Sequence, residues 1–243
     1  MGSTFPGATG LSEVTIYDWP GADGCAGGSP HMHTASTEAY VVLEGSGRLE
    51  TLNSDGFTSS PLEPGVVLWF TPGTVHRAIN DSGNLKVLVV MQNAGLPENG
   101  DAVMTFPPEH LADAEAYGRA AALEIKDADA GLAEGEEAAR RRRDLALEGY
   151  LALKAAVIES GPAAMADFHA AAARLVAPRT AAWADVLAGG AAEQAETTRQ
   201  QLASLDAAES FYLGKARTTM GQRKNRRFYG MCGRIQTWEL SDS

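Results

Sequence analysis

The chain has 243 residues, 44% hydrophobic and 21% charged, which is ordinary for a globular protein with one large or two small domains. Its net charge of −11 at pH 7 disfavours binding to nucleic acid, because an acidic surface repels phosphates. The longest apolar run, residues 87–91, is far shorter than the roughly 20 residues that span a bilayer.

The sequence shows no signal for export or for a lipid anchor. Residues 1–10 lack a charged segment and an apolar segment, so we expect no secretory leader. Pro6 stands where a myristoylation site that starts at Gly2 needs Ser or Thr. The two cysteines, Cys25 and Cys232, are too few for a disulfide framework. We therefore expect reduced thiols and a cytoplasmic location.

Short β-type runs dominate the first part of the chain, from residue 15 to about residue 92. Turn-forming residues separate them, as in Gly45-Ser46-Gly47 and Asn53-Ser54-Asp55-Gly56. Strands at this spacing, without a helical pattern between them, are typical of an antiparallel sandwich or barrel. The clearest runs are residues 14–17, 39–43, 47–52, 66–70 and 86–92.

Composition changes abruptly after a loop at residues 93–108 that is rich in Gly, Asn and Pro. Alanine, the strongest helix former, supplies 33 of the 104 residues from 111 to 214. Pro108 and Pro162 can each open a helix, the first running to about Ala130, and Pro178 and residues 189–190 mark breaks. We expect four or five helices packed as a bundle. Apolar residues at helical spacing mark two faces: Leu147, Tyr150, Leu151, Val157 and Ile158, then Met165, Phe168, His169, Ala172, Leu175 and Val176.

The tail is basic. Between residues 215 and 234 it has no acidic residue and seven basic ones: Lys215, Arg217, Arg223, Lys224, Arg226, Arg227 and Arg234. The whole chain carries −11 and these residues +7, so the rest carries −18. We expect the tail to dock on its own acidic body or on a partner subunit. Residues 226–240 are β-like and predict a strand that returns to the barrel. The predicted domains are 1–106 (β-barrel), 107–214 (α-helical) and 215–243 (basic tail).

Four side chains in the β half have the spacing of a metal site. His31 and His33 are two residues apart, so on a strand their imidazoles share a face, about 6.6 Å apart along the backbone. Glu38 opens the next β run and its carboxylate can join them. His76 follows the turn at residues 71–75 and can supply the fourth donor. Three imidazoles and one carboxylate suit divalent Fe, Mn, Ni, Cu, Co or Zn, and the affinity order does not choose among these metals.

This segment resembles the cupin family, whose first motif is G-x5-H-x-H-x(3,4)-E-x6-G and whose second is G-x5-P-x-G-x2-H-x3-N. Cys25 stands where the first motif opens with Gly, and the Pro of the second motif is displaced to Pro72. Both departures affect turns, and neither affects a ligand. The resemblance does not extend to the helical half. The motif positions that match are His31, His33, Glu38 and Gly45 in the first motif, and Gly65, Gly73, His76 and Asn80 in the second.

The resemblance implies an α+β fold: an N-terminal cupin β-barrel, an antiparallel jelly roll, followed by an α-helical bundle. It also implies one divalent transition metal bound by His31, His33, Glu38 and His76. A barrel that keeps these histidines only for packing is the alternative. Cupin barrels tend to pair through sheet edges, so the resemblance further implies a homodimer, and we expect no nucleic acid or membrane partner.

The family includes dioxygenases, sugar isomerases and epimerases, decarboxylases, and non-catalytic sugar-binding or regulatory proteins. We expect a metal-dependent enzyme that acts on a small oxygen-rich molecule, with a dioxygenase slightly favoured over an isomerase or lyase. Two open positions on the metal would suit O2 and a chelating substrate. A non-catalytic metal- or sugar-binding protein is the alternative.

Further polar residues are weaker candidates. Tyr40 shares strand parity with Glu38, so its hydroxyl can reach a substrate, with a core aromatic as the alternative. Arg48 can pair with a substrate carboxylate, with a solvated strand face as the alternative. We expect His169, on an apolar helical stripe, to be a core histidine. The four arginines at residues 140–143 follow three glutamates at helical spacing and predict an exposed, salt-bridged face.

Overall fold

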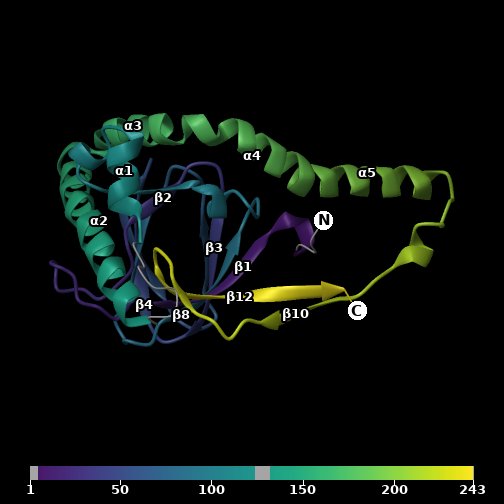
Figure 1. The fold of residues 1–243 in the computed structure, drawn as a ribbon, viewed down its shortest axis with the longest axis horizontal. Helices are drawn as coiled ribbons and strands as arrows, with labels where there is room; N and C mark the ends of the chain where they lie inside the picture. Colours follow the sequence, from purple (N-terminus) through teal and green to yellow (C-terminus); the bar gives the residue numbers. More distant parts are fainter. Residues whose placement is uncertain (1–4, 124–131, 243) are drawn as a thin grey trace.

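The computed structural model describes residues 5–123 and 132–242. Two antiparallel sheets form the N-terminal half, and helices follow (Figure 1). This arrangement confirms the predicted α+β class. The strands of this half are β1 (Gly10–Ile16), β2 (His31–His33), β3 (Glu38–Glu44), β4 (Gly47–Asn53), β5 (Gly56–Leu62), β6 (Val67–Phe70), β7 (Val75–Ile79), β8 (Lys86–Met91) and β9 (Ala102–Met104).

The two sheets enclose an apolar core between their inner faces. One sheet has seven strands, three of them from the tail: β10 (Thr219–Arg223), β11 (Phe228–Tyr229) and β12 (Gly233–Asp242). Its order is β10-β12-β1-β8-β3-β6 with β11 beside β12, and the other sheet has the order β5-β4-β7-β2-β9. Alternation along each strand builds this core: in β8, Val87, Val89 and Met91 are buried and the residues between them are half-buried. Side chains from both sheets join them, among them Val14, Tyr40, Val42, Leu49, Phe70 and Ala78.

Helices cover the outer face of the five-stranded sheet. A second apolar core joins outward residues of that sheet, such as Met32, Leu52 and Val75, to buried residues of α2 and α3, such as Tyr150 and Phe168. No helix among the described residues has the length and apolar content that a membrane span requires. The helices are α1 (Ala114–Ala121), α2 (Leu132–Ser160), α3 (Ala166–Val176), α4 (Thr180–Leu187) and α5 (Glu193–Asp206).

The first helix begins later than the sequence predicts. Pro108–His110 form a single 3-10 turn, and α1 starts at Ala114 because the Asp113 side chain caps it by accepting a hydrogen bond from the Ala116 N–H (2.8 Å). The last part of the predicted helix, residues 124–130, lies outside the described residues.

The expected breaks at Pro178 and at residues 189–190 are bends. A 3-10 turn at Ala177–Arg179 and a wide π-helical turn at Ala188–Ala192 join α3, α4 and α5 into one curved run (Figure 1). Gly190, with φ −117° and ψ −106°, absorbs the irregularity of the wide turn. The curved run carries α5 beyond the barrel, where it buries no residue.

The tail returns to the barrel as β10 (Thr219–Arg223), β11 (Phe228–Tyr229) and β12 (Gly233–Asp242). β12 pairs antiparallel with β1, with Ile235 opposite Val14. Two basic residues of the tail meet acidic groups of the body: Arg223 pairs with Glu13 (2.9 Å) and Arg234 with Asp18 (3.2 Å).

Two of the four arginines at residues 140–143 form the salt bridges that the sequence predicts, and the other two do not. Arg140 and Arg141 pair with glutamates one helical turn earlier. Arg143 is two positions after the exposed Arg141, so it lies on the opposite side of α2 and points into the protein, with 1% of its surface exposed. Its guanidinium donates to the carbonyls of Trp19 (2.7 Å), Gly27 (3.0 Å) and Pro20 (3.0 Å). Arg142 likewise donates to the Gly230 carbonyl (2.6 Å), so these two arginines tie α2 to loops beside the barrel.

We therefore expect Arg143→Ala to destabilise the protein by about 3 kcal/mol, since three carbonyls that face its guanidinium would lose their partner. The free energy of unfolding in urea measures this effect. Arg141→Ala is the matched control, because its exposed pair with Glu137 contributes less than about 0.5 kcal/mol. Equal stability of the two variants would contradict the structural role assigned to Arg143.

Candidate metal centre

Three histidines come from two adjacent strands of the five-stranded sheet. β2 pairs with β7 so that His31 lies directly opposite His76. Residues opposite one another project from the same face, and His33, two positions along β2, shares that face. Met32, between the two histidines of β2, projects the other way into the core under the helices. Strand alternation thus directs all three imidazoles into the space between the sheets.

Glu38 reaches the same space from the opposite sheet. It begins β3, and its side chain points inward together with those of Tyr40 and Val42. Its Oε2 lies 3.2 Å from Nε2 of His33 and 3.1 Å from Nε2 of His76. One donor atom from each of these three side chains and from His31 lies within 4.8 Å of the others, and all four residues are buried. The structure therefore brings together the four residues that the motifs singled out.

Backbone carbonyls fix the tautomers of two rings. Nδ1 of His31 lies 2.8 Å from the Ser29 carbonyl, and Nδ1 of His76 lies 3.3 Å from the Thr74 carbonyl. Because a carbonyl oxygen can only accept, Nδ1 donates in both rings. In the neutral ring, Nε2 then carries a lone pair and faces the centre.

Asp101 orients the third ring, and the motifs did not identify it. Its Oδ2 lies 3.2 Å from Nδ1 of His33. Its Oδ1 accepts hydrogen bonds from the backbone N–H of Thr34 (2.8 Å) and of Ala35 (2.6 Å), so the carboxylate is fixed from both sides. A carboxylate behind a histidine is a common partner of a metal-binding imidazole, because it fixes the ring and increases its basicity.

Unpaired lone pairs therefore meet at the centre of the cluster. Oε2 of Glu38 and Nε2 of His76 are buried, and neither has a hydrogen-bond partner among the described residues. When His76 is neutral, its Nε2 and Oε2 of Glu38 are two acceptors 3.1 Å apart that repel each other, and each buried polar atom left unpaired costs about 1–3 kcal/mol. A cation between the donor atoms would remove both penalties. The cluster thus fits a metal ion, and its donor set does not choose which divalent metal.

The electrostatics of the cluster favour positive charge at its centre. Burial alone would raise the pKa of Glu38, but the imidazoles of His33 and His76 outweigh it and hold that pKa well below its usual range. Burial also disfavours the charged form of His33, yet Asp101 and Glu38 raise its pKa to about 9. Burial and the two other imidazoles lower the pKa of His31.

Tyr40 projects into the same space, as its parity with Glu38 predicts. Its hydroxyl lies 3.2 Å from Sγ of Cys232, and its ring centroid is 6.5 Å from that of His76. Burial and the nearby Cys232 and Glu38 raise the pKa of Tyr40 well above its usual value, so the phenol keeps its proton. Cys232 directly precedes β12, and burial raises the pKa of its thiol too. The tail thus places a side chain beside the cluster that the sequence indicated only as a reduced cysteine.

Arg48 is not brought to the cluster. On β4, Thr51 lies opposite His76 and shares its inward face, so Arg48, three positions away, projects outward. Its guanidinium donates to the Asp81 carboxylate and to Sγ of Cys25. This position favours the alternative in which Arg48 belongs to a solvated strand face, and not a role in binding a substrate at the cluster.

Glu50 also points away from the cluster. It accepts hydrogen bonds from the Tyr150 hydroxyl (3.0 Å) and from Nζ of Lys154 (2.9 Å), both on α2. These contacts tie α2 to the outer face of β4. Tyr40 is therefore the candidate acid–base group of this part of the barrel.

The least buried side chains around the cluster mark the direction from which a ligand can approach. Glu38 lies opposite Phe70 on β6 and Met91 on β8, and the ring of Phe70 is 4.1 Å from that of His76. His33, Phe70 and Met91 retain 7%, 8% and 9% exposure, whereas His76 has none. A ligand would therefore approach on this side.

His169 lies outside the cluster. It is half-buried on α3, and its Nε2–H donates a hydrogen bond to the Gly73 carbonyl (3.1 Å). The N–H of Gly73 in turn donates to the His33 carbonyl (3.0 Å). His169 thus connects α3 to the turn before β7, a more specific contact than the core position that the sequence predicts.

Comparison with known proteins agrees with the site. The family model described as a cupin domain matches residues 20–91. No curated protein is significantly similar to the chain in sequence.

Solved structures with a similar barrel include three bacterial proteins. One, from Acidithiobacillus ferrooxidans, is assigned as a sugar phosphate isomerase (29% identity, 35% of this chain and 49% of that chain, TM-score 0.28). A sugar 3,4-ketoisomerase from Thermoanaerobacterium thermosaccharolyticum, in complex with TDP, has 17% identity (38% and 64%, TM-score 0.31). An oxalate decarboxylase assigned by prediction, from Thermotoga maritima, has 19% identity (35% and 64%, TM-score 0.27).

The present chain spans about half the length of the first of these proteins and under two thirds of the other two. The family model covers strands β2 to β8 of the antiparallel sandwich and all four residues of the buried His–Glu cluster. Residues 20–91 of this chain are a cupin domain.

Proposed function

We propose that this protein is a metal-dependent enzyme that acts on a small oxygen-rich organic molecule. One observation carries the proposal: donor atoms of His31, His33, Glu38 and His76 converge in a buried space, with Oε2 of Glu38 and Nε2 of His76 unpaired. A divalent transition metal such as Fe, Mn, Ni, Cu, Co or Zn matches this donor set. When bound, the metal would supply Lewis acidity and, beyond its four protein ligands, coordination positions for substrate oxygens.

The residues around the cluster suit an anionic or oxygen-rich ligand. Tyr40 keeps its proton because burial and nearby groups raise its pKa, so its hydroxyl can donate a hydrogen bond to a substrate oxygen beside Glu38. The same hydroxyl lies 3.2 Å from Sγ of Cys232, which can exchange a hydrogen bond with it. Phe70 and Met91 exclude water from the approach to the cluster.

Within this class we favour a dioxygenase over an isomerase or lyase, because a site open to two external ligands can bind O2 beside a chelating substrate. The distinguishing experiment loads the protein with each candidate metal and offers diols, hydroxy acids and sugars, with and without O2. Consumption of O2 with product formation supports a dioxygenase. Turnover that is equal without O2 supports an isomerase or lyase.

A non-catalytic binding protein is the second candidate, and one observation favours it. Many side chains of the core that adjoins the cluster are apolar, with Val14, Leu49 and Leu62 among them. A site with few polar groups beside the metal ligands can bind a ligand without transforming it. Absence of turnover with every metal and every substrate would favour this candidate.

His33→Ala is expected to reduce bound metal from one ion per chain to a small fraction of that, because it removes a ligand at the accessible side of the cluster. Metal analysis of the purified protein measures the change. His169→Ala is the control, since this half-buried histidine hydrogen-bonds only a backbone carbonyl outside the cluster. Unchanged stoichiometry in His33→Ala would contradict the ligand assignment.

Asp101→Asn is expected to weaken metal binding by about 10–100-fold, because the amide cannot support the His33 ring as a carboxylate does. Competition with a chelator of known affinity measures the effect. Asp81→Asn, at an exposed ion pair with Arg48, should leave affinity unchanged. If the two variants bound metal equally well, Asp101 would have no role in the site.

Tyr40→Phe should retain the metal and lose about 10²–10⁴-fold in kcat on the substrate found in the panel, because the proton at the phenol oxygen is removed while the ring still fills its place. Tyr212→Phe, at a half-buried tyrosine far along the chain, is the control. A Tyr40→Phe enzyme with normal kcat would limit Tyr40 to packing.

A further inference from the structure

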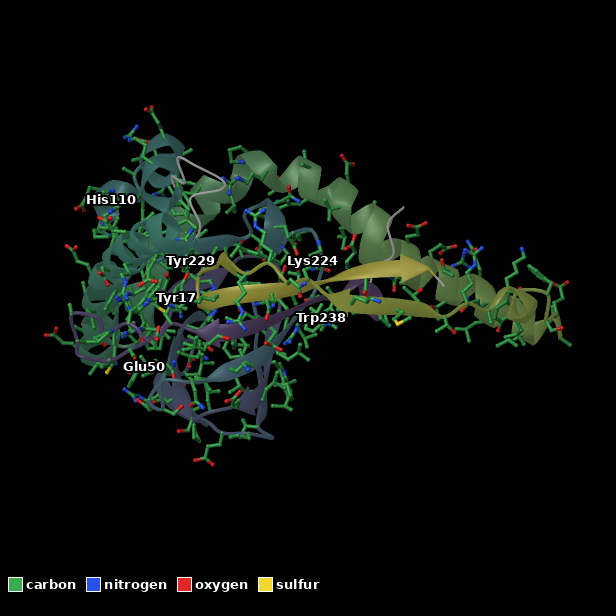
Figure 2. The ribbon with its side chains drawn as sticks, turned by 60° about the horizontal axis from the view of Figure 1, so that its bottom comes forward. Tyr17, Glu50, His110, Lys224, Tyr229 and Trp238 are labelled. Atoms are coloured by element: carbon green, nitrogen blue, oxygen red, sulfur yellow. The ribbon has the colours of Figure 1, made fainter. Side chains whose placement is uncertain are left out.

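A cavity of about 430 Å³ opens among the helices. It lies between residues 105–112, 148–153 and 164–174, on the helical side of the five-stranded sheet and away from the His–Glu cluster. In Figure 1, α1, α2 and α3 gather at this end of the molecule, and in Figure 2 His110, the neighbour of Leu111, marks it. Packed interiors leave few voids larger than a water molecule, whereas sites for small organic ligands commonly have this volume.

The cavity exists because small side chains face it from both helices. Gly149 and Ala152 of α2 line it, as do Ala164 and Ala171 on the side of α3, and none of these residues is large enough to fill it. Position 149 has no room for a side chain, because a Cβ there would lie 2.1 Å from the Thr105 carbonyl oxygen. This close approach of α2 to the loop after β9 forms one wall of the cavity.

The interior of the cavity is apolar. Phe106, Leu111 and Phe168 line it and are 2%, 6% and 7% exposed. Pro107, also buried, and the half-buried Leu153 contribute further apolar surface. Because transfer of apolar surface out of water is favourable, this lining suits a ligand with an aliphatic or aromatic body.

Charged side chains of both signs lie at the mouth of the cavity. Glu148, Asp167 and Arg174 line it and are exposed, and among the described residues none of the three has an ion-pair partner. By contrast, Arg140 and Arg141 of α2 pair with glutamates of their own helix. The mouth therefore offers two carboxylates and one guanidinium to a ligand.

We propose that this cavity binds a small zwitterion with an apolar body, which is the chemistry of an apolar amino acid. The body would fill the space beside Phe106 and Phe168, the ammonium group would face Glu148 or Asp167, and the carboxylate would face Arg174. An apolar amine would leave Arg174 without a partner, and an apolar acid would leave both carboxylates without one. The site depends neither on the proposed catalytic function nor on the metal.

Isothermal titration calorimetry on the full chain tests the proposal with leucine, phenylalanine and tryptophan. At least one of these amino acids should bind at one site per chain. For the amino acid that binds most tightly, the analogue without the carboxylate and the analogue without the ammonium group should each bind about 5-fold more weakly, because each loses an ion pair at an exposed position. Glycine, which has no apolar body, should not bind measurably.

Variants locate the binding in the cavity. Ala152→Trp should abolish it, because the indole would occupy the space from an exposed position on α2. Arg174→Gln should weaken binding of the amino acid and of its carboxylate analogue, but not of its amine analogue. Glu148→Gln with Asp167→Asn should weaken binding of the amino acid and of its amine analogue only. Glu159→Gln is the control, since this exposed carboxylate on α2 lies outside the cavity. Circular dichroism establishes that each variant is folded.

Three results would overturn the proposal. The first is that none of the three amino acids binds at millimolar concentration. The second is equal affinity of the Ala152→Trp variant and the wild type, which would place the binding elsewhere. The third is that both analogues bind as tightly as the amino acid, because the cavity would then accept apolar molecules whatever their charge.

Discussion

The candidate site depends on the hydrogen bonds behind its histidines. Ser29 and Thr74 accept from Nδ1 of His31 and His76, so in the neutral rings Nε2 carries a lone pair toward the cluster, and Asp101 orients the third ring. Lone pairs that converge without protons between them are unfavourable unless a cation joins them. The backbone around β2 and β7 therefore does more than position four side chains, because it also sets the protonation that makes them metal ligands.

The outer faces of the two sheets have different surroundings. The outward residues of the five-stranded sheet pack under α2 and α3, and Arg143 and Glu50 tie the long helix to that side. The seven-stranded sheet supplies Glu38 and Tyr40 to the interior, and Val67 and Trp69 on its β6 strand are exposed. β12 extends this sheet, and Cys232, which directly precedes it, lies beside the Tyr40 hydroxyl, so the tail contributes to the surroundings of the site.

Local spacing predicted much of the fold and the four clustered residues. Alternation within His31-Met32-His33 directs two imidazoles to one face, and β-type runs with turn residues between them predict the sandwich. Spacing could not reveal Asp101 or Cys232. Asp101 is 68 positions from His33, and Cys232 is 192 positions from Tyr40, so only the folded chain brings these groups together. The arginine run shows the same limit, since helical spacing pairs Arg141 with Glu137 but does not say which face of α2 is buried.

The sequence by itself determined the class of the protein, the strands that alternate, the alanine-rich helices and the donor set of the cluster. These follow from local periodicity and from motif spacing, which act over a few residues. Tertiary structure alone decided which nitrogen of each ring faces the centre, that Arg48 and Glu50 point away from it, and that α5 extends beyond the barrel. Each of these depends on the pairing of strands and the packing of helices far apart in sequence, because the free energy of a buried polar group is set by the neighbours that the fold places around it.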